Sequence, residues 1–228
     1  MPVPAPVRPV LWVHIALGAV ALCAGLGAMA TKKGGRRHRN FGKAFVAAIA
    51  GVVLSALAIT AFTRDAFLAT IAVFSGYVVF AGYRALSQKR PGSAGRLDYA
   101  AAGLAGLVAA GMVALGVAGV LDGASRGAVL VAFGGLALAF AAQDAATFHR
   151  GPSSRFDWLY RHVARMLGGY IATVTAVSAV NLTMLPPVVR WLWPTAVGTP
   201  LIALWIRRYQ RRFEGDGRAG GGVEPDGE

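Results

Sequence analysis

About seven apolar stretches, separated by short polar gaps, make up most of this chain. A helix needs about 20 residues to cross the ~30 Å hydrocarbon core of a bilayer, and each stretch is near that length. Backbone polar groups in lipid have no water to bind, so segments of this length must satisfy them internally as α-helices. The sequence therefore predicts an all-α, polytopic transmembrane helix bundle. We expect its spans at 10–30, 43–63, 66–87, 98–121, 127–148, 159–184 and 188–207.

The composition also favours a membrane environment. Hydrophobic residues make up 56% of the chain and charged residues only 14%, whereas soluble domains carry about 25% charged residues. The chain thus lacks the polar side chains that would cover a bundle in water. Its net charge of +13 would suit nucleic acid, but the cations lie in short gaps beside apolar stretches. We therefore expect a lipid bilayer as partner and no nucleic acid.

Lysine and arginine alternate between the two sides of the predicted membrane. The gaps after the first, third, fifth and seventh stretches hold 19 of the 23 basic residues, and the opposite ends hold only Arg8, Arg64, Arg126 and Arg190. Basic loops stay in the cytoplasm, so this pattern predicts an outside N-terminus and a cytoplasmic C-terminus. The excess of arginine over lysine is common in GC-rich bacterial genomes. We expect a multi-pass protein of the bacterial inner membrane, with anionic lipid headgroups at its cytoplasmic face.

Three segments follow from this pattern: an external N-terminal segment (1–9), a seven-helix transmembrane domain (10–213) and a Gly-rich acidic tail (214–228). The tail has no apolar face, which predicts disorder. The first span ends in Ala28-Met29-Ala30, which resembles a signal-peptide cleavage site, so a cleaved first span is an alternative. Its length and the basic residues that follow at once favour a retained span instead.

Polar side chains in apolar spans are costly, so they are the first candidates for chemistry. His14 lies near the outer end of the first span, while His38, His149, His162 and Asp144 approach the cytoplasmic boundary. In one interpretation, those last four residues, or the three histidines with Asp157 in place of Asp144, bind a divalent metal ion, because imidazole and carboxylate suit zinc or iron. Their spacing matches no short ligand motif.

A second interpretation is a haem site. Two histidines from neighbouring helices at equal depth hold the iron of haem b in many membrane cytochromes, and His38 with His162 would form such a pair. His14 has no outer partner, which argues against a second haem. If the second and sixth spans pack together, the two histidines come within about 10 Å, a helix–helix packing distance.

A third interpretation assigns these residues no ligand. The loop histidines then face solvent or lipid headgroups, and His14 completes a buried hydrogen-bond network. Asp144 pairs with a nearby cation from Arg84, Arg150 or Arg165, which orients the bundle without a further function.

Two segments resemble a known family. The pattern His14-x3-Gly18 precedes a basic loop that closes with His38-Arg39-Asn40-Phe41-Gly42-Lys43, and a later segment reads Arg161-His162-Val163-Ala164-Arg165-Met166. They resemble a bacterial family of predicted multi-span membrane proteins of unknown function, with a first-helix histidine and a His-Arg-x-x-Gly loop. The resemblance implies a multi-helix bundle. It singles out His14, His38, His162 and Arg165 as cofactor-binding residues and brings no established activity.

No nucleotide-binding loop, HExxH motif or Schiff-base lysine occurs in the sequence, so enzymatic activity is not predicted. The prediction is an integral inner-membrane protein of undetermined activity, whose candidate function is to bind a metal or haem near the cytoplasmic face in a redox or assembly role. The alternatives are a small transporter, which the lack of a midplane carboxylate disfavours, and a structural or lipid-interacting subunit. A homo-oligomer or a place in a membrane complex fits any of these.

The fourth stretch is rich in glycine, with Gly111 near its centre. Small residues let helix backbones approach closely, and such contacts drive association in lipid. We therefore expect this helix in the middle of the bundle or at a subunit contact. A leucine at Gly111 should then destabilise the bundle.

Overall fold

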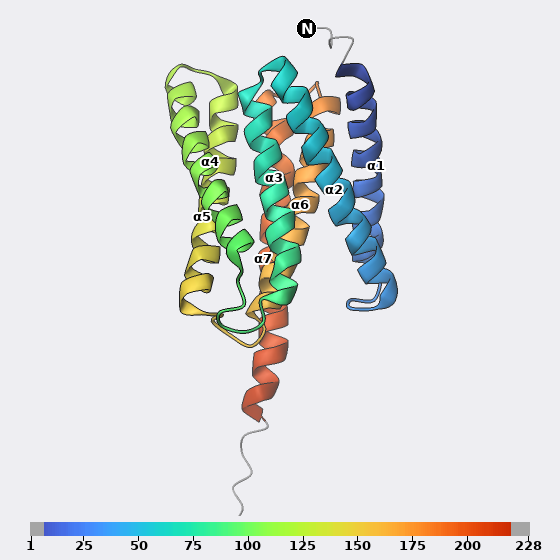
Figure 1. The fold of residues 1–228 in the computed structure, drawn as a ribbon, viewed down its shortest axis with the longest axis vertical. Helices are drawn as coiled ribbons and strands as arrows, with labels where there is room; N and C mark the ends of the chain where they lie inside the picture. Colours follow the sequence, from blue (N-terminus) through green and yellow to red (C-terminus); the bar gives the residue numbers. More distant parts are fainter. Residues whose placement is uncertain (1–6, 220–228) are drawn as a thin grey trace, which may run out of the picture.

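The computed structural model describes residues 7–219, which form seven α-helices standing side by side (Figure 1). Each expected span falls on one of them, and the predicted all-α bundle is confirmed. A short 3-10 helix, η2 (Ala85–Ser87), extends the third helix. The α-helices are α1 (Arg8–Ala30), α2 (Arg36–Thr63), α3 (Ala66–Arg84), α4 (Arg96–Leu121), α5 (Ser125–Arg150), α6 (Asp157–Asn181) and α7 (Pro187–Ala219).

Within the described residues, six helices, α1 to α6, are long and apolar enough to cross a membrane. Their outer faces expose large apolar side chains, including Leu54, Leu107 and Leu121 at 69%, 73% and 82%. Such exposure is costly in water and ordinary in lipid. The chain is therefore a multi-pass membrane protein. Helix α7 falls outside these six and contains Pro194 and Pro200, so a seventh crossing stays a prediction.

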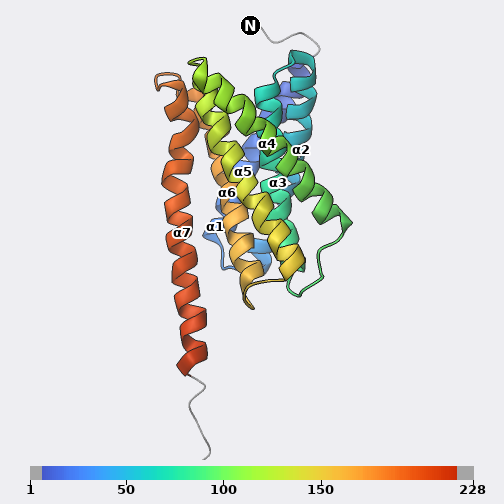
Figure 2. The same cartoon turned by 90° about the vertical axis from the view of Figure 1, so that its left-hand side faces the viewer.

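The connecting loops place the basic gaps of the sequence at one end of the bundle. Loops 31–35, 85–95 and 151–156 lie at the lower end in Figure 1, and the α2–α3, α4–α5 and α6–α7 connections lie at the upper end. We call the lower end the basic end. Helix α7 continues past it (Figures 1 and 2).

Helix α7 also runs past the predicted end of the transmembrane domain. The boundary at residue 213 falls inside this helix, which reaches Ala219. The rest of the predicted tail, 220–228, lies outside the described residues, as do residues 1–6 of the predicted external segment.

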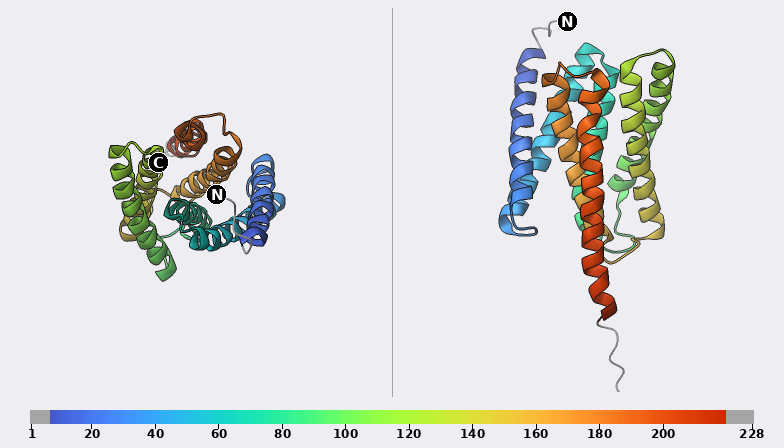
Figure 3. Two further views of the ribbon diagram at one scale, coloured as in Figure 1. Left: turned by 90° about the horizontal axis from the view of Figure 1, so that it is seen from above. Right: turned by 180° about the vertical axis from the view of Figure 1, so that it is seen from behind.

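Helices α3 and α6 hold the middle of the bundle, with α1 and α2 on one side and α4 and α5 on the other (Figures 1 and 3). On the α5 side, Phe74 of α3 stacks on Phe133 with ring centroids 5.6 Å apart. Val78 of α3 and Met112 of α4 are almost completely buried beside them. Polar side chains of α3 and α6 at the basic end can therefore meet residues from both halves of the bundle.

Helix α4 is peripheral, which corrects our expectation of a central position, while a subunit contact on this helix stays a prediction (Figure 3). It packs chiefly against α5, and glycines make that approach close. A Cβ built on Gly116 would lie 2.8 Å from the Val131 nitrogen and 2.9 Å from the Gly127 oxygen, both backbone atoms. Glycine is required here because backbone cannot move aside as a flexible side chain can.

Gly111, in contrast, has no other atom within 4 Å of the position where its Cβ would lie. Our expectation that a leucine there forces helices apart is wrong, because this glycine is exposed on the outer face of α4. Composition identified the helix that needs small residues. It did not identify the face of that helix that meets α5.

Candidate functional site

His38 lies in the first turn of α2, where the chain enters the bundle from the basic end. Its Nδ1 lies 2.9 Å from the carbonyl oxygen of Ala28, near the end of α1. A carbonyl only accepts hydrogen bonds, so Nδ1–H must be the donor and the neutral ring carries its lone pair on Nε2. The half-buried imidazole is thus oriented by a helix other than its own.

His162 repeats this arrangement in the second turn of α6. Its Nδ1 lies 2.9 Å from the carbonyl oxygen of Gly82 on α3, again leaving the lone pair on Nε2. Gly82 permits the contact, because a Cβ there would lie 2.8 Å from the Cβ of Arg165. Among the described residues, no hydrogen-bond partner occupies Nε2 of either histidine.

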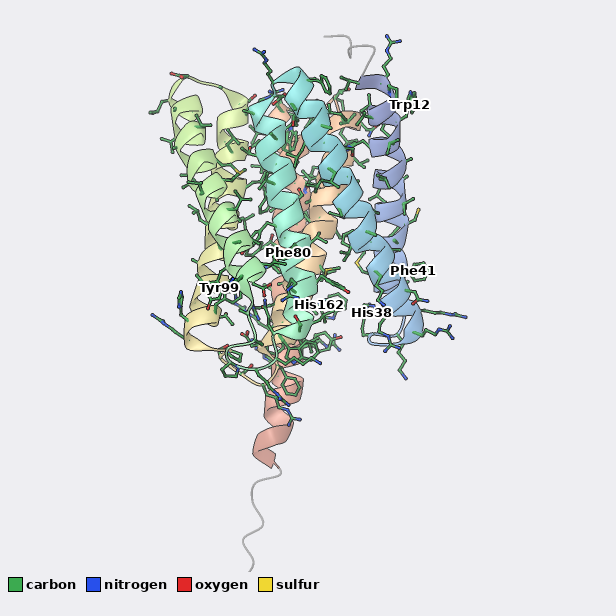
Figure 4. All side chains as sticks on the ribbon, viewed as in Figure 1. Trp12, His38, Phe41, Phe80, Tyr99 and His162 are labelled. Carbon is green, nitrogen blue, oxygen red and sulfur yellow. The ribbon has the colours of Figure 1, made fainter. Side chains whose placement is uncertain are left out.

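The two histidines occupy matching depths on helices that run in the same direction. Phe45 of α2 packs against Tyr170 of α6, with ring centroids 6.4 Å apart. His38 precedes Phe45, and His162 precedes Tyr170, by about two helical turns each. Both therefore lie at the basic end, as Figure 4 shows.

The surroundings of His38 leave room beside its ring. Gly42 follows it by one helical turn on the same face of α2, and a Cβ built there would meet no atom within 4 Å. Lys32 of the adjacent α1–α2 loop lines an open cleft together with Arg36 and Arg37 of the first turn of α2. This end of α2 thus combines an oriented imidazole, open space and positive charge.

Asp144 occupies a separate buried cluster between α3, α5 and α6. Tyr77 donates its hydroxyl to Oδ2 at 2.5 Å, and Arg165 Nη2 donates to Oδ1 at 3.1 Å. Arg161 Nη1 lies 3.4 Å from the same oxygen, while its Nε donates to Asp157 at 3.0 Å. Three members of the cluster, Asp144, Arg161 and Arg165, are at most 4% exposed. Of the three arginines that we predicted as partners of Asp144, the structure places Arg165 beside it.

Arg165 has further partners that hold its guanidinium in place. Nη2 also donates to the Phe140 carbonyl at 3.1 Å and to Gln143 Oε1 at 3.0 Å. The guanidinium carbon lies 4.0 Å from the centroid of the Phe140 ring, a cation–π distance. The Arg165 side chain therefore links α6 to α5. Its suggested role in cofactor binding stays a prediction.

Tyr77 and Gln143 are the members of this cluster that sequence reasoning missed. Gln143 directly precedes Asp144, and that adjacency was a usable signal. Tyr77 lies on α3, far from Asp144 in sequence, and its spacing to the other residues carries no information. Only the packing of α3 against α5 and α6 brings its hydroxyl to the carboxylate.

His14 lies apart from this end of the bundle. Its Nδ1 is 3.0 Å from Ser55 Oγ and 3.2 Å from the Val52 carbonyl oxygen, both on α2. Ser55 donates its own hydroxyl to the Gly51 carbonyl at 2.7 Å, so it accepts from His14. The interaction joins α1 to α2 and matches the hydrogen-bond network that our third interpretation assigns to His14.

His149 is exposed at the end of α5 and contacts the Tyr99 ring, with ring centroids 5.8 Å apart. Asp144 is engaged with arginines, and His38 and His162 with backbone carbonyls. Within residues 7–219, no group of three or more His, Cys, Asp or Glu side chains is arranged to hold a metal ion. Of the four residues in the metal interpretation, His38 and His162 lie at matching depth on α2 and α6, and their approach to within about 10 Å stays a prediction.

No protein-family model, curated protein or solved structure matches this chain.

Proposed function

We propose that this membrane protein binds haem b at the basic end, with His38 and His162 as the two axial ligands of the iron. One observation carries the proposal: two imidazoles at matching depth on parallel helices each donate Nδ1–H to a carbonyl of another helix. That hydrogen bond sets the tautomer and ring orientation, and it raises the basicity of Nε2 as a ligand. A metal-ligating histidine generally has such a second partner.

The surroundings of the pair suit a porphyrin. A flat group would approach His38 through the open space at Gly42. Lys32, Arg36 and Arg37 supply positive charge where the propionates of a haem would reach the membrane surface. Bis-histidine haem supplies one-electron oxidation and reduction, so the function would be electron transfer or haem delivery. The chain's own contribution is to bind, orient and shield the group.

The proposal predicts a specific loss of bound haem. The full chain, expressed with added haem precursor and purified in detergent, should show the absorption spectrum of low-spin, bis-histidine haem. His38→Ala and His162→Ala should each lose most of that absorption, because one remaining imidazole leaves the iron an open axial position. His149→Ala is the matched control and should keep the spectrum, since His149 is exposed beside Tyr99.

Two outcomes would overturn this assignment. One is a wild-type protein that takes up no haem even after incubation with hemin in detergent. The other is a double variant, His38→Ala with His162→Ala, that retains the wild-type spectrum. Elemental analysis of the same samples tests the competing site: stoichiometric zinc without porphyrin would support a metal bound by the two imidazoles instead.

We further infer that the basic end faces the cytoplasm of a bacterial cell and contacts anionic lipid headgroups, with α7 as a seventh span. Alkaline phosphatase is active only after export. Fused into the α2–α3 turn at residues 64–65, it should therefore be active, and fused at the C-terminus it should be silent. An active C-terminal fusion would reverse the orientation or show that α7 does not cross.

A further inference from the structure

A small pocket opens at the basic end between the α3–α4 loop, the end of α5 and the start of α6. Its lining includes Gln88, Arg90, Ser93, Thr147 and Arg161. The space that a water-sized sphere can enter is about 10 Å³, which is room for roughly one water molecule or one oxygen atom of a larger group. Neither His38 nor His162 lines this pocket, so it is a second site.

The walls of the pocket are held by specific contacts. Asp98 accepts two hydrogen bonds from Arg84, at 2.7 and 2.8 Å, and a third from the Gly95 amide at 2.8 Å. Together these bonds tie both ends of the α3–α4 loop to α4. Within the loop, the Lys89 amine lies 4.6 Å from the centroid of the Trp158 ring on α6. The loop that lines the pocket is thus anchored on two helices.

Arg161 lines the pocket and has an unused donor. Its side chain is 4% exposed; Nε binds Asp157 and Nη1 lies near Asp144. Its Nη2 is buried and has no hydrogen-bond partner among residues 7–219. A buried donor without a partner costs free energy, and the cost is larger when the donor belongs to a charged group. We therefore expect the Nη2 group to bind an acceptor from outside the chain.

The charge around the pocket favours an anionic acceptor over a neutral one. Asp144 and Asp157 are shared by the guanidinium groups of Arg161 and Arg165. Arg90, on the exposed rim, adds another positive charge for which no ion pair is found in the described chain. Arg90, Arg161 and Arg165 together therefore carry one positive charge more than the two carboxylates balance.

We propose that this pocket binds a phosphate group at the basic end of the protein. One phosphate oxygen enters and accepts from Arg161 Nη2, while the remaining oxygens stay at the rim beside Arg90. The size of the pocket admits a single oxygen, and guanidinium groups bind phosphate through charge-assisted hydrogen bonds. The phosphate belongs either to a lipid headgroup or to a free ion, because the pocket opens where the bundle meets the membrane surface.

Two probes distinguish the sources, both applied to the full chain. Thermal unfolding in detergent is measured with inorganic phosphate at constant ionic strength, and native mass spectrometry counts phosphatidylglycerol retained by the protein. Arg90→Gln should weaken binding about tenfold, as expected for the loss of one charge-assisted contact. Arg161→Gln should abolish it. Arg155→Gln, an exposed arginine of the neighbouring α5–α6 loop, is the matched control and should bind as wild type.

Stabilisation by inorganic phosphate would identify a free ion, and selective retention of phosphatidylglycerol would identify a lipid headgroup. The proposal is wrong if neither probe binds, since the pocket then holds only water. It is also wrong if Arg155→Gln weakens binding as much as Arg90→Gln, which would indicate general attraction to a basic surface. Arg90 is exposed, so its variant keeps the test decisive even if Arg161→Gln does not fold.

Discussion

Replacing Asp144 by asparagine should lower the free energy of unfolding by about 3–5 kcal/mol, the cost of leaving buried charge uncompensated. The side chain keeps its size, but Arg165 and Arg161 lose the carboxylate that both of them approach. The Tyr77 hydroxyl also loses its charged acceptor. Water cannot replace the lost partner of the two arginines, because Arg165 is 1% exposed and Arg161 is 4% exposed.

The measurement is reversible unfolding of the purified chain in detergent, with Asp65→Asn as the matched control. Asp65 pairs with Arg126 at 3.4 Å on the surface, where an ion pair contributes at most about 1 kcal/mol. Asparagine also remains a good cap for α3 at that position. Equal losses in the two variants would show that the buried cluster does not depend on the Asp144 charge.

Leucine at Gly116 should destabilise the α4–α5 hairpin by about 3 kcal/mol, at the upper end for overpacking. Its Cβ would lie 2.8 Å from the Val131 nitrogen and 2.9 Å from the Gly127 oxygen, so the two helices must separate. Separation also removes dispersion contacts, which are the main attraction between these helices in lipid.

Gly111→Leu provides the control on the same helix. The substitution is identical, yet no atom lies within 4 Å of the new Cβ, and the side chain would face outward. Its thermal stability in detergent should stay within about 0.5 kcal/mol of wild type, as for most surface changes. A loss at Gly111 as large as at Gly116 would mean that the outer face of α4 is covered, for example by a second copy of the chain.

Much of the architecture could be predicted because it depends on local properties of the chain. Twenty apolar residues in lipid must form a helix, whatever their neighbours are. Short basic gaps then decide how successive helices alternate, and loops 31–35, 85–95 and 151–156 duly share one end. The pairing of Asp144 with Arg165 was also accessible, since α5 and α6 are joined by a short loop and both residues approach the basic end.

The candidate site was predicted only in part. The sequence contains two similar segments, with Arg37-His38 ahead of Phe45 and Arg161-His162 ahead of Tyr170. It could not show that Phe45 and Tyr170 pack together or that Ala28 and Gly82 supply the acceptors for the two imidazoles. The metal interpretation grouped His149 and Asp144 with the pair because all four lie near one boundary. Depth in the membrane is readable from sequence, whereas rotation about each helix axis is not.

The sequence by itself determined the helices, their order and alternation, and which polar side chains lie near which end. These follow from hydropathy, length and charge, which act on each segment separately. Only the tertiary structure decided which face of each helix meets another. It separated Gly116, pressed against the backbone of α5, from Gly111, and it placed Tyr77 on Asp144. The physical reason is that an apolar helix in lipid is nearly equivalent all round, so close packing and buried hydrogen bonds between distant segments select its orientation.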